Sequence, residues 1–386
     1  MMDNLAAEIE AMAPTLVGWR RDFHRHPELA FEERRTSAVI REFLESEGIE
    51  VKPCGRTGLR GVLRGGKPGR TVALRADMDA LPVAELSEHD YVSENPGVMH
   101  ACGHDGHMAI LMGAARVLAA HRDTLPGTVV LLFQPSEENP PGGARLMIEE
   151  GALDGVDAVF GLHLWQPMPS GIVGLRAGAS MAQADEFEVV VEGRGGHASQ
   201  PDRTVDPVVV ASHVVVAAQT IVSRFSNPLE PVVVSFTTIH GGRIHNIIPD
   251  SVTMTGTVRT LDPETQRAVK KRLGEVCEST CRLFGASAKF TYNDGYPPVI
   301  NDAASVELVR RVAVRELGAE AVETITPIMG GEDFAYYLQH VPGAFALLGI
   351  GDDRPYPHHN ARFDIDESVL PVGVRLMTAV ALEMLA

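Results

Sequence analysis

Short runs of β-branched and aliphatic residues alternate with helical patterns along the first half of the chain. The strand patterns cover residues 71–76, 128–133 and 158–164, and the segments between them predict helices at about 106–120 and 143–150. Strands separated by helices are typical of a mainly parallel sheet covered by helices on both faces. The pattern therefore predicts an α/β fold in which functional groups collect at the carboxyl ends of the strands.

The order of the elements changes between about residues 180 and 294. Six elements are predicted there, in the order strand, helix, strand, strand, helix, strand, which is the order of a ferredoxin-like unit. They cover residues 186–193, 204–225, 231–239, 251–260, 262–285 and 287–292. The turn-rich segment Asn-Asp-Gly-Tyr-Pro-Pro at 293–298 follows and predicts a boundary.

Helix and strand patterns resume after this boundary. Helices are predicted at about 302–317, 332–339 and 367–385, with a strand at 344–349. A chain of 386 residues exceeds the size at which a single hydrophobic core usually stops growing. We therefore expect one α/β domain, formed by residues 1–179 and 295–386, that is interrupted by a smaller inserted α+β domain at 180–294.

Composition and charge narrow the choice of partners. The formal net charge is −17, from 51 acidic against 34 basic residues, so a nucleic-acid partner is not expected. Four cysteines do not make a disulfide framework in so long a chain, and reduced thiols are expected. The N-terminal segment lacks a basic region and we find no apolar run of 18 residues, so we expect no membrane span and a cytoplasmic location.

The nine residues 99–107 bring one thiol, three imidazoles and a carboxylate into a short segment before an alanine-rich helix. Cys102 and His104 lie two residues apart in a predicted loop, so both side chains can converge on one ion. Sulfur and imidazole together suit zinc, cobalt, nickel or manganese better than magnesium or calcium. The alternative is a buried cysteine in a polar turn with solvated histidines.

Candidate ligands also follow the predicted strands. The adjacent Glu137 and Glu138 come after the strand at 128–133, and His163 interrupts the apolar strand at 158–164. Of two successive carboxylates, one can bind a metal while its neighbour acts as the general base that amide hydrolysis requires. Acidic residues that complement a helix dipole, and a core histidine, are the structural alternatives. Of His358 and His359, one is expected to complete the site, and spacing alone does not say which.

Nine motifs together give a specific resemblance over essentially the whole length. They are HPELAFEE (26–33), LRADMDALPV (74–83), MHACGHDGH (99–107), QPSEE (134–138), GLHL (161–164), GRGGHASQP (193–201), HNIIPD (245–250), GGEDF (330–334) and HHNARFD (358–364). The chain resembles a metal-dependent amidohydrolase and peptidase family that includes aminoacylases and carboxypeptidase G. Within that family it is similar to the branch of hippurate hydrolase, N-acyl-amino-acid amidohydrolases and plant auxin-conjugate hydrolases.

The resemblance implies two divalent metal ions per subunit, zinc, manganese, cobalt or nickel, with Glu137 as the catalytic base. The implied metal ligands are Cys102, His104, Glu138, His163 and His359. His359 is preferred to His358 because it stands four residues before the Phe-Asp pair, as the ligand does in the family. Asp79 and Asp105 are expected to orient these ligands without binding the metal themselves.

The inserted domain is implied to act as a lid and a dimerisation domain. His197 resembles a histidine that family members extend into the site of a neighbouring subunit to stabilise the oxyanion, although a surface imidazole without a role is the alternative. Asn246 and Arg259 resemble groups that bind the substrate backbone and its free carboxylate, and Arg suits a carboxylate through its bidentate fork. A homodimer or higher homo-oligomer is therefore expected.

The function expected from these residues is hydrolysis of the amide bond of an N-acyl amino acid such as hippurate. Rival functions are a dipeptidase, a deacetylase of the N-acetyl-diaminopimelate type, and a non-catalytic metal- or ligand-binding protein on the same scaffold. A thiol redox protein is disfavoured because Cys102 has no second cysteine nearby in the sequence. His26 belongs to one of the motifs, but its residue type and position alone indicate no chemistry.

Overall fold

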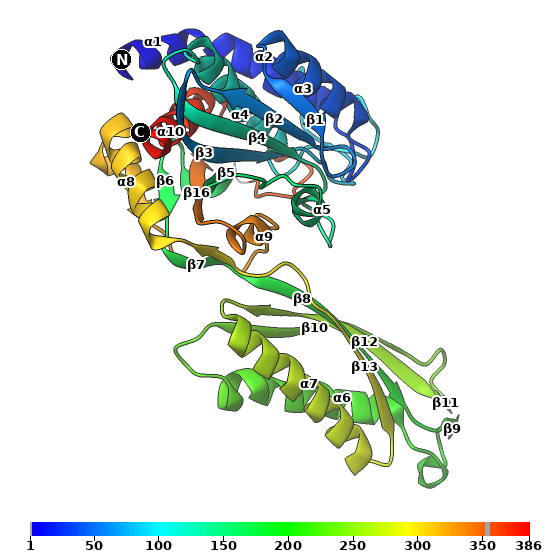
Figure 1. The fold of residues 1–386 in the computed structure, drawn as a ribbon. Helices are drawn as coiled ribbons and strands as arrows, with labels where there is room; N and C mark the ends of the chain where they lie inside the picture. Colours follow the sequence, from blue (N-terminus) through cyan, green and yellow to red (C-terminus); the bar gives the residue numbers. More distant parts are fainter. Residues whose placement is uncertain (1, 352–355) are drawn as a thin grey trace. The chain divides into compact units, whose positions relative to one another are not determined.

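The computed structural model describes residues 2–351 and 356–386, and the chain divides into two compact units (Figure 1). The first unit comprises Met1–Gly178, Ile300–Thr326 and Asp333–Ala386, and the second comprises Ala179–Val299 and Pro327–Glu332. The chain thus returns to the first unit at Ile300, whereas the sequence placed this boundary at 294/295. The segment Pro327–Glu332 belongs to the second unit because it pairs with its first strands, with Ala182 N donating to Ile328 O at 3.0 Å.

The first unit is built on an eight-stranded sheet in the order β1-β2-β4-β3-β5-β16-β6-β15. Its strands are β1 (Glu50–Pro53), β2 (Leu59–Arg64), β3 (Lys67–Asp77), β4 (Pro126–Gln134), β5 (Ala158–Pro169), β6 (Val173–Leu175), β15 (Val322–Thr324) and β16 (Gly343–Gly351). The four central strands β4, β3, β5 and β16 are parallel, and β1, β2 and β6 join by antiparallel pairing. The mainly parallel α/β sheet predicted from the sequence is therefore confirmed.

The central strands are buried on both faces, as the continuous apolar runs predicted. On β4, Val129, Leu131 and Phe133 join the main core, while Val130 and Leu132 are buried on the other face, because successive side chains point in opposite directions. Helices α4 (His104–Ala120) and α10 (Leu370–Leu385) pack on β3, and α5 (Gly143–Glu149) packs on β4. The remaining helices of the unit are α1 (Met2–Ala11), α2 (Ala13–Arg25), α3 (Arg34–Ser46), α8 (Ala303–Leu317) and α9 (Ala335–Leu338).

The second unit contains a four-stranded antiparallel sheet in the order β10-β12-β8-β13, with α6 and α7 packed on it (Figure 1). Its elements are β8 (Gln183–Glu192), α6 (Pro207–Thr220), β10 (Val232–Gly241), β12 (Ser251–Thr260), α7 (Pro263–Leu283) and β13 (Ser287–Asn293). This chain order and sheet order are those of a ferredoxin-like unit. Two short pairings, β9 (Gly196–His197) with β11 (Ile247–Ile248) and β7 (Gly178–Met181) with β14 (Val299–Asn301), complete the strands.

Two helical segments are long and apolar enough to cross a membrane by length and composition, Pro207–Phe225 and Glu367–Leu385. Polar residues interrupt both segments, so neither is an unbroken apolar run, and the expectation of no membrane span stays a prediction. The C-terminal segment has 67% of its apolar window buried, since α10 lies in the core of the first unit between α4, α8 and β3. The segment Pro207–Phe225 has only 28% buried, so much of its apolar surface is left uncovered within the chain.

Candidate metal centre

The candidate ligands of the first unit come from the segment after β4, from within β5, from the loop before α4 and the start of α4, and from a loop before α10. Gly103 precedes α4 in the left-handed region, at φ 90°, and glycine adopts this conformation without a steric penalty. Helix α4 begins at His104, two residues earlier than predicted. This turn places Cys102 and His104 on opposite sides of one glycine, where both are buried.

The two histidines nearest to Cys102 present the same ring nitrogen. His104 Nδ1 lies 2.9 Å from Asp79 O, and His163 Nδ1 lies 2.7 Å from Leu164 O. A carbonyl oxygen only accepts, so both Nδ1 atoms donate, and Nε2 is the nitrogen that each ring can offer to a metal. Among the described residues His104 Nε2 is buried without a hydrogen-bond partner. This is the tautomer and orientation of metal-binding imidazoles.

Cys102 belongs to two groups of potential ligands. One contains His104 and His163, and the other contains Glu138 and His359; within each group all ligand atoms lie within 4.8 Å of one another. Cys102 Sγ is 3.5 Å from His163 Nε2, and His359 Nε2 is 3.1 Å from Glu138 Oε1. The five predicted ligands therefore converge, and Cys102 is common to the two groups.

The two neighbouring histidines of the C-terminal loop differ in their contacts. His359 adopts φ 66°, and its backbone N–H donates to Ala101 O at 2.8 Å, which joins the loop to the Cys102 turn. His358 instead stacks on Trp165, with ring centroids 4.8 Å apart, and its Nε2 donates to Leu164 O at 2.9 Å. The choice of His359 as the ligand agrees with these contacts.

Buried carboxylates hold the backbone that carries Glu137 and Glu138. The two oxygens of Asp79 accept the amide hydrogens of Glu137 and Glu138, at 2.9 and 3.0 Å. Glu33 accepts the preceding amide, Ser136 N, at 2.9 Å, and Ser136 has a positive φ of 52°. Three successive amides are thus fixed by two acidic side chains. The role expected for Asp79 agrees with this geometry, whereas sequence reasoning gave no role to Glu33.

His107 was left without a role by the sequence, and its contacts give it one. Its Nε2 accepts the amide hydrogen of Leu164 at 2.8 Å, so its Nδ1 carries the proton, which it donates to Asp77 Oδ1 at 2.6 Å. Both ring nitrogens are therefore used within the protein. His107 fixes the strand residue next to His163 rather than offering a lone pair to an ion.

The fully buried Arg75 links three of the segments around the candidate site. Arg75 donates to Asp77 at 2.6 Å, to Gln134 at 2.9 Å and to Asp333 at 2.9 Å. Asp333 also accepts from Gln134 and from Ala144 N. Burial raises the pKa of Asp333 to about 6, against the opposing effect of Arg75. The network ties the carboxyl ends of β3 and β4 to the segment before α9.

Asp105 does not contact a candidate ligand through its hydrogen bonds in the described structure. Its carboxylate accepts from Arg20 at 2.8 Å and from His24 at 2.7 Å, and both residues lie on α2. It therefore anchors the first turn of α4 to α2, which differs from the role expected for it. His26 caps α2, since its Nδ1 donates to Asp22 O at 2.8 Å.

The electrostatics of the cluster fit a divalent cation. Burial and the neighbouring Glu138 and Glu137 raise the pKa of the Cys102 thiol well above its ordinary value. Burial lowers the pKa of His104, but the nearby Asp77 and Asp79 outweigh it and raise the pKa to about 10. Carboxylates close to both side chains contribute to these shifts, together with burial in the case of Cys102. A buried thiol, imidazole lone pairs and a carboxylate form a donor set for zinc-like ions.

The second unit carries the other candidate residues. His197 pairs with Ile247 in the β9–β11 ribbon, and Ala198 N donates to Asn246 O at 3.1 Å, so His197 and Asn246 lie together. Arg259 lies on β12 opposite Ala184 of β8, and its Nε donates to Thr257 Oγ1 at 3.0 Å. The structure therefore brings His197 and Asn246 together but places Arg259 elsewhere on the sheet.

A thiol, imidazoles and paired carboxylates that gather beside an α/β sheet are the donor set of a metal-dependent hydrolase. The model of Peptidase family M20/M25/M40 matches residues 73–383, and the chain belongs to this family.

Named relatives cover nearly the whole chain. The N-acetyl-L-cysteine deacetylase of Bacillus subtilis (strain 168) is 44% identical over 363 residues, covering 94% of this chain and 86% of that protein. IAA-amino acid hydrolase ILR1-like 2 of Arabidopsis thaliana is 42% identical over 386 residues, covering 97% of this chain and 87% of its own. The structure of Bacillus subtilis YXEP, a dinuclear metal-binding peptidase of the M20 family, is similar with a TM-score of 0.85, 36% identity and coverage of 97% and 98%.

Proposed function

We propose that this protein hydrolyses the amide bond of N-acyl amino acids, of the hippurate type, to a carboxylic acid and a free amino acid. The observation that carries the proposal is the placement of two adjacent carboxylates, with Glu138 beside Cys102 and His359, and with the buried Glu137 close to Glu138 and His104. The substrate class is supported by the names of two relatives, a deacetylase of N-acetyl-L-cysteine and a hydrolase of IAA-amino acids.

Cys102, His104, Glu138, His163 and His359 would hold two divalent cations, which would supply Lewis acidity to lower the pKa of a water molecule and to polarise the substrate carbonyl. The chain supplies the proton transfer and the positioning. Glu137 accepts a proton from the attacking water and passes it to the departing amine. The backbone that carries Glu137 is held in place by two carboxylates. Asp79 accepts the amide hydrogen of Glu137, and Glu33 accepts that of Ser136.

A panel of substrates tests the proposal and separates it from its rivals. Purified protein is assayed with hippurate, acetyl-methionine, acetyl-diaminopimelate and a dipeptide after reconstitution with zinc, manganese, cobalt or nickel in turn. We expect the highest kcat/KM with an N-acyl amino acid. A preference for the dipeptide would favour a peptidase, an activity that the name of another relative, a thermostable carboxypeptidase, suggests. No hydrolysis with any substrate and metal would contradict an enzymatic role.

Arg259 is proposed to bind the free carboxylate of the substrate. It is half-buried on β12, and its only described hydrogen bond uses Nε, which leaves the terminal nitrogens of the guanidinium for a ligand. Burial lowers the pKa of Arg259, with Asp185 acting in the opposite direction, so an added anion would be favourable here.

The variant Arg259→Gln is expected to raise KM for N-acyl amino acids by about 10-fold to 100-fold, because a charged hydrogen bond contributes about 1.5–3 kcal/mol. Steady-state kinetics with the same substrate in its carboxamide form provide the control, since that substrate has no anion to lose. Equal losses of kcat/KM with both substrates would show that Arg259 does not read the carboxylate.

A homodimer with shared sites is proposed from the layout of the second unit. Ser251 and Arg259 lie eight residues apart on β12, about 27 Å along an extended strand, and the His197 ribbon adjoins the Ser251 end. One copy of this unit cannot place His197 and Arg259 on one small substrate, so we propose that two copies contribute. The uncovered apolar surface of Pro207–Phe225 supports an association of this unit with a second copy.

Mixing two inactive variants tests the shared site. In a mixed dimer of His197→Ala and Glu137→Gln subunits, one site would combine an intact Glu137 with an intact His197 from the other subunit. We expect activity to return when the two proteins exchange subunits, and each variant mixed with itself serves as the control. If mixed dimers form, as shown by differently tagged subunits, and remain inactive, the shared site is excluded.

We further propose a reducing, cytoplasmic location. All four cysteines are free and buried, including Cys277 and Cys281 one turn apart on α7. Fractionation of the native cells, with the protein found outside the cytoplasm, would contradict this.

A further inference from the structure

A second histidine–carboxylate cluster lies in the first unit, outside the Cys102 centre. It consists of His24 on α2 and of Glu85 and His89 in the loop between β3 and α4. The Nε2 atoms of His24 and His89 each lie 3.2 Å from the same oxygen, Glu85 Oε1. All three potential ligand atoms lie within 4.8 Å of one another.

These spacings match the edges of a metal coordination shell. Zinc binds imidazole nitrogen and carboxylate oxygen at about 2.0–2.2 Å in a tetrahedron, so neighbouring ligand atoms stand about 3.3 Å apart. The two nitrogen-to-oxygen distances of 3.2 Å agree with this value. Two histidines and one glutamate are also a ligand set that zinc uses in proteins.

Hydrogen bonds to the rest of the protein already orient two of the three side chains, His24 and Glu85. His24 Nδ1 donates to Asp105 Oδ2 at 2.7 Å, so Nε2 is the ring nitrogen that faces Glu85 Oε1, 3.2 Å away. Glu85 Oε2 accepts the amide hydrogen of Ser93 at 2.6 Å, which turns Oε1 toward the two imidazoles. Such bonds behind the ligand hold a metal-binding side chain in one orientation.

His89 has a position that its protein contacts alone do not explain. Its ring stacks on Tyr91, with centroids 3.7 Å apart and an interplanar angle of 12°, and the side chain is only 15% exposed. Within the described residues, however, neither of its ring nitrogens has a hydrogen bond of acceptable geometry, although Glu85 lies close by. Buried polar atoms are nearly always satisfied, so a missing ligand is indicated.

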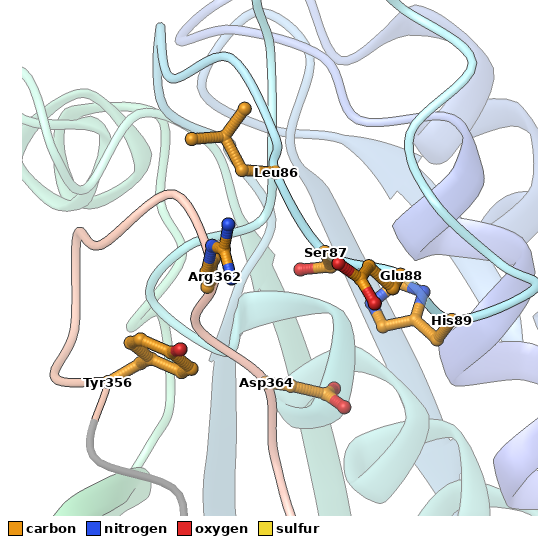
Figure 2. Close-up of a pocket in the computed structure, with 7 residues that line it drawn as sticks. All are labelled: Leu86, Ser87, Glu88, His89, Tyr356, Arg362 and Asp364. Carbon is orange, nitrogen blue, oxygen red and sulfur yellow. The ribbon is translucent and has the colours of Figure 1, made fainter.

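The surroundings favour a cation and give it access. Four carboxylates gather around the cluster, Glu85, Asp105, Asp364 and Glu367, and the basic side chains among them are Arg20 and Arg21. Figure 2 shows His89 in the wall of a cavity of about 240 Å³, with Arg362 and Asp364 on the segment across from it. This cavity provides a route for an ion and for the water that would complete its shell.

We propose that His24, Glu85 and His89 bind a third divalent cation of the zinc class, separate from the pair at Cys102. The ion fastens the loop around Glu85 and His89 to α2. It takes the place of the proton through which His24 Nε2 otherwise bonds to Glu85 Oε1, while Nδ1 keeps its bond to Asp105. Because ligand imidazoles must be neutral, uptake of this ion releases protons.

Crystals of the full chain equilibrated with zinc, with data collected at the zinc absorption edge, test the position directly. We expect an anomalous peak about 2.0–2.2 Å from Glu85 Oε1 and from the two Nε2 atoms, in addition to the peaks at Cys102. Absence of density at this position overturns the proposal without affecting the Cys102 centre.

Metal content in solution separates a specific site from binding at crystal concentration. After dialysis against zinc-free buffer, we expect the variant His89→Ala to hold one zinc ion fewer per chain than the wild type, with hydrolysis at the Cys102 centre retained. His121→Ala is the matched control, because His121 is an exposed histidine of the same unit that pairs only with Glu8 in the described structure. Equal zinc contents in wild type and His89→Ala overturn the proposal, whatever the fate of the proposed hydrolase activity.

Discussion

Replacing Glu137 with Gln is expected to lower kcat for an N-acyl amino acid by about 10²-fold to 10⁴-fold, the usual contribution of a general base. Gln keeps the size of the side chain but cannot accept the proton of the attacking water. The backbone of residue 137 stays in place because Asp79 holds its amide, an interaction that does not use the Glu137 side chain. The loss should therefore fall on kcat rather than on binding.

The neighbouring carboxylate provides the matched control. Glu138 belongs with Cys102 and His359, so Glu138→Gln should lower the metal content measured by elemental analysis, whereas Glu137→Gln should leave it at two ions in the Cys102 centre. Turnover of Glu137→Gln at the wild-type rate would remove Glu137 from the mechanism. Loss of metal in both variants would show that the two carboxylates do not divide the roles.

Replacing Arg75 with Leu is expected to destabilise the first unit by about 3–5 kcal/mol, the cost of removing one partner from a buried ion pair. Leu fills much of the space but leaves the carboxylates of Asp77 and Asp333 buried without their counter-charge, since both accept from Arg75 at under 3 Å. Unfolding in guanidinium chloride, followed by circular dichroism, measures the change in the free energy of unfolding.

An exposed arginine on another strand of the same sheet is the control for this change. Arg64 on β2 pairs with Glu50 at 3.1 Å, with 66% of its side chain exposed. Arg64→Leu should leave the unfolding midpoint close to that of the wild type, because water screens exposed pairs and replaces their contacts. Arg75→Leu unfolding at the same denaturant concentration as Arg64→Leu would show that the buried network does not stabilise the fold.

The candidate metal centre could be proposed from the sequence because its residue types are concentrated in short motifs. Cys102 and His104 are separated by one glycine, and Glu137 and Glu138 are adjacent, so their proximity needs no knowledge of the fold. The strand pattern then indicated which sheet edge they share. His163 was expected at the end of its strand, whereas β5 continues to Pro169, so it lies inside the strand and points at Cys102 from there.

The positioning residues could not be predicted in the same way. Arg75 and Asp333 are separated by 258 residues, and Glu33 and Ser136 by 103. Arg75, Asp333 and Glu33 look like ordinary charged residues in the sequence. Only the tertiary fold brings them next to the candidate site. Asp105 shows the reverse case. Its place in the 99–107 motif suggested that it supports a metal ligand, but α2 packs on α4 and the Asp105 carboxylate accepts hydrogen bonds from Arg20 and His24 instead.

The sequence by itself determined the parallel sheet, the strand and helix order of the inserted unit and the residue types of the metal centre, because hydrophobic periodicity and short motifs are local properties of the chain. The tertiary structure decided which nitrogen each histidine presents, that Cys102 is shared by two ligand groups, and that Arg259 lies far along β12 from His197. These features depend on contacts between distant segments, and such contacts exist only once the strands have paired in their observed order.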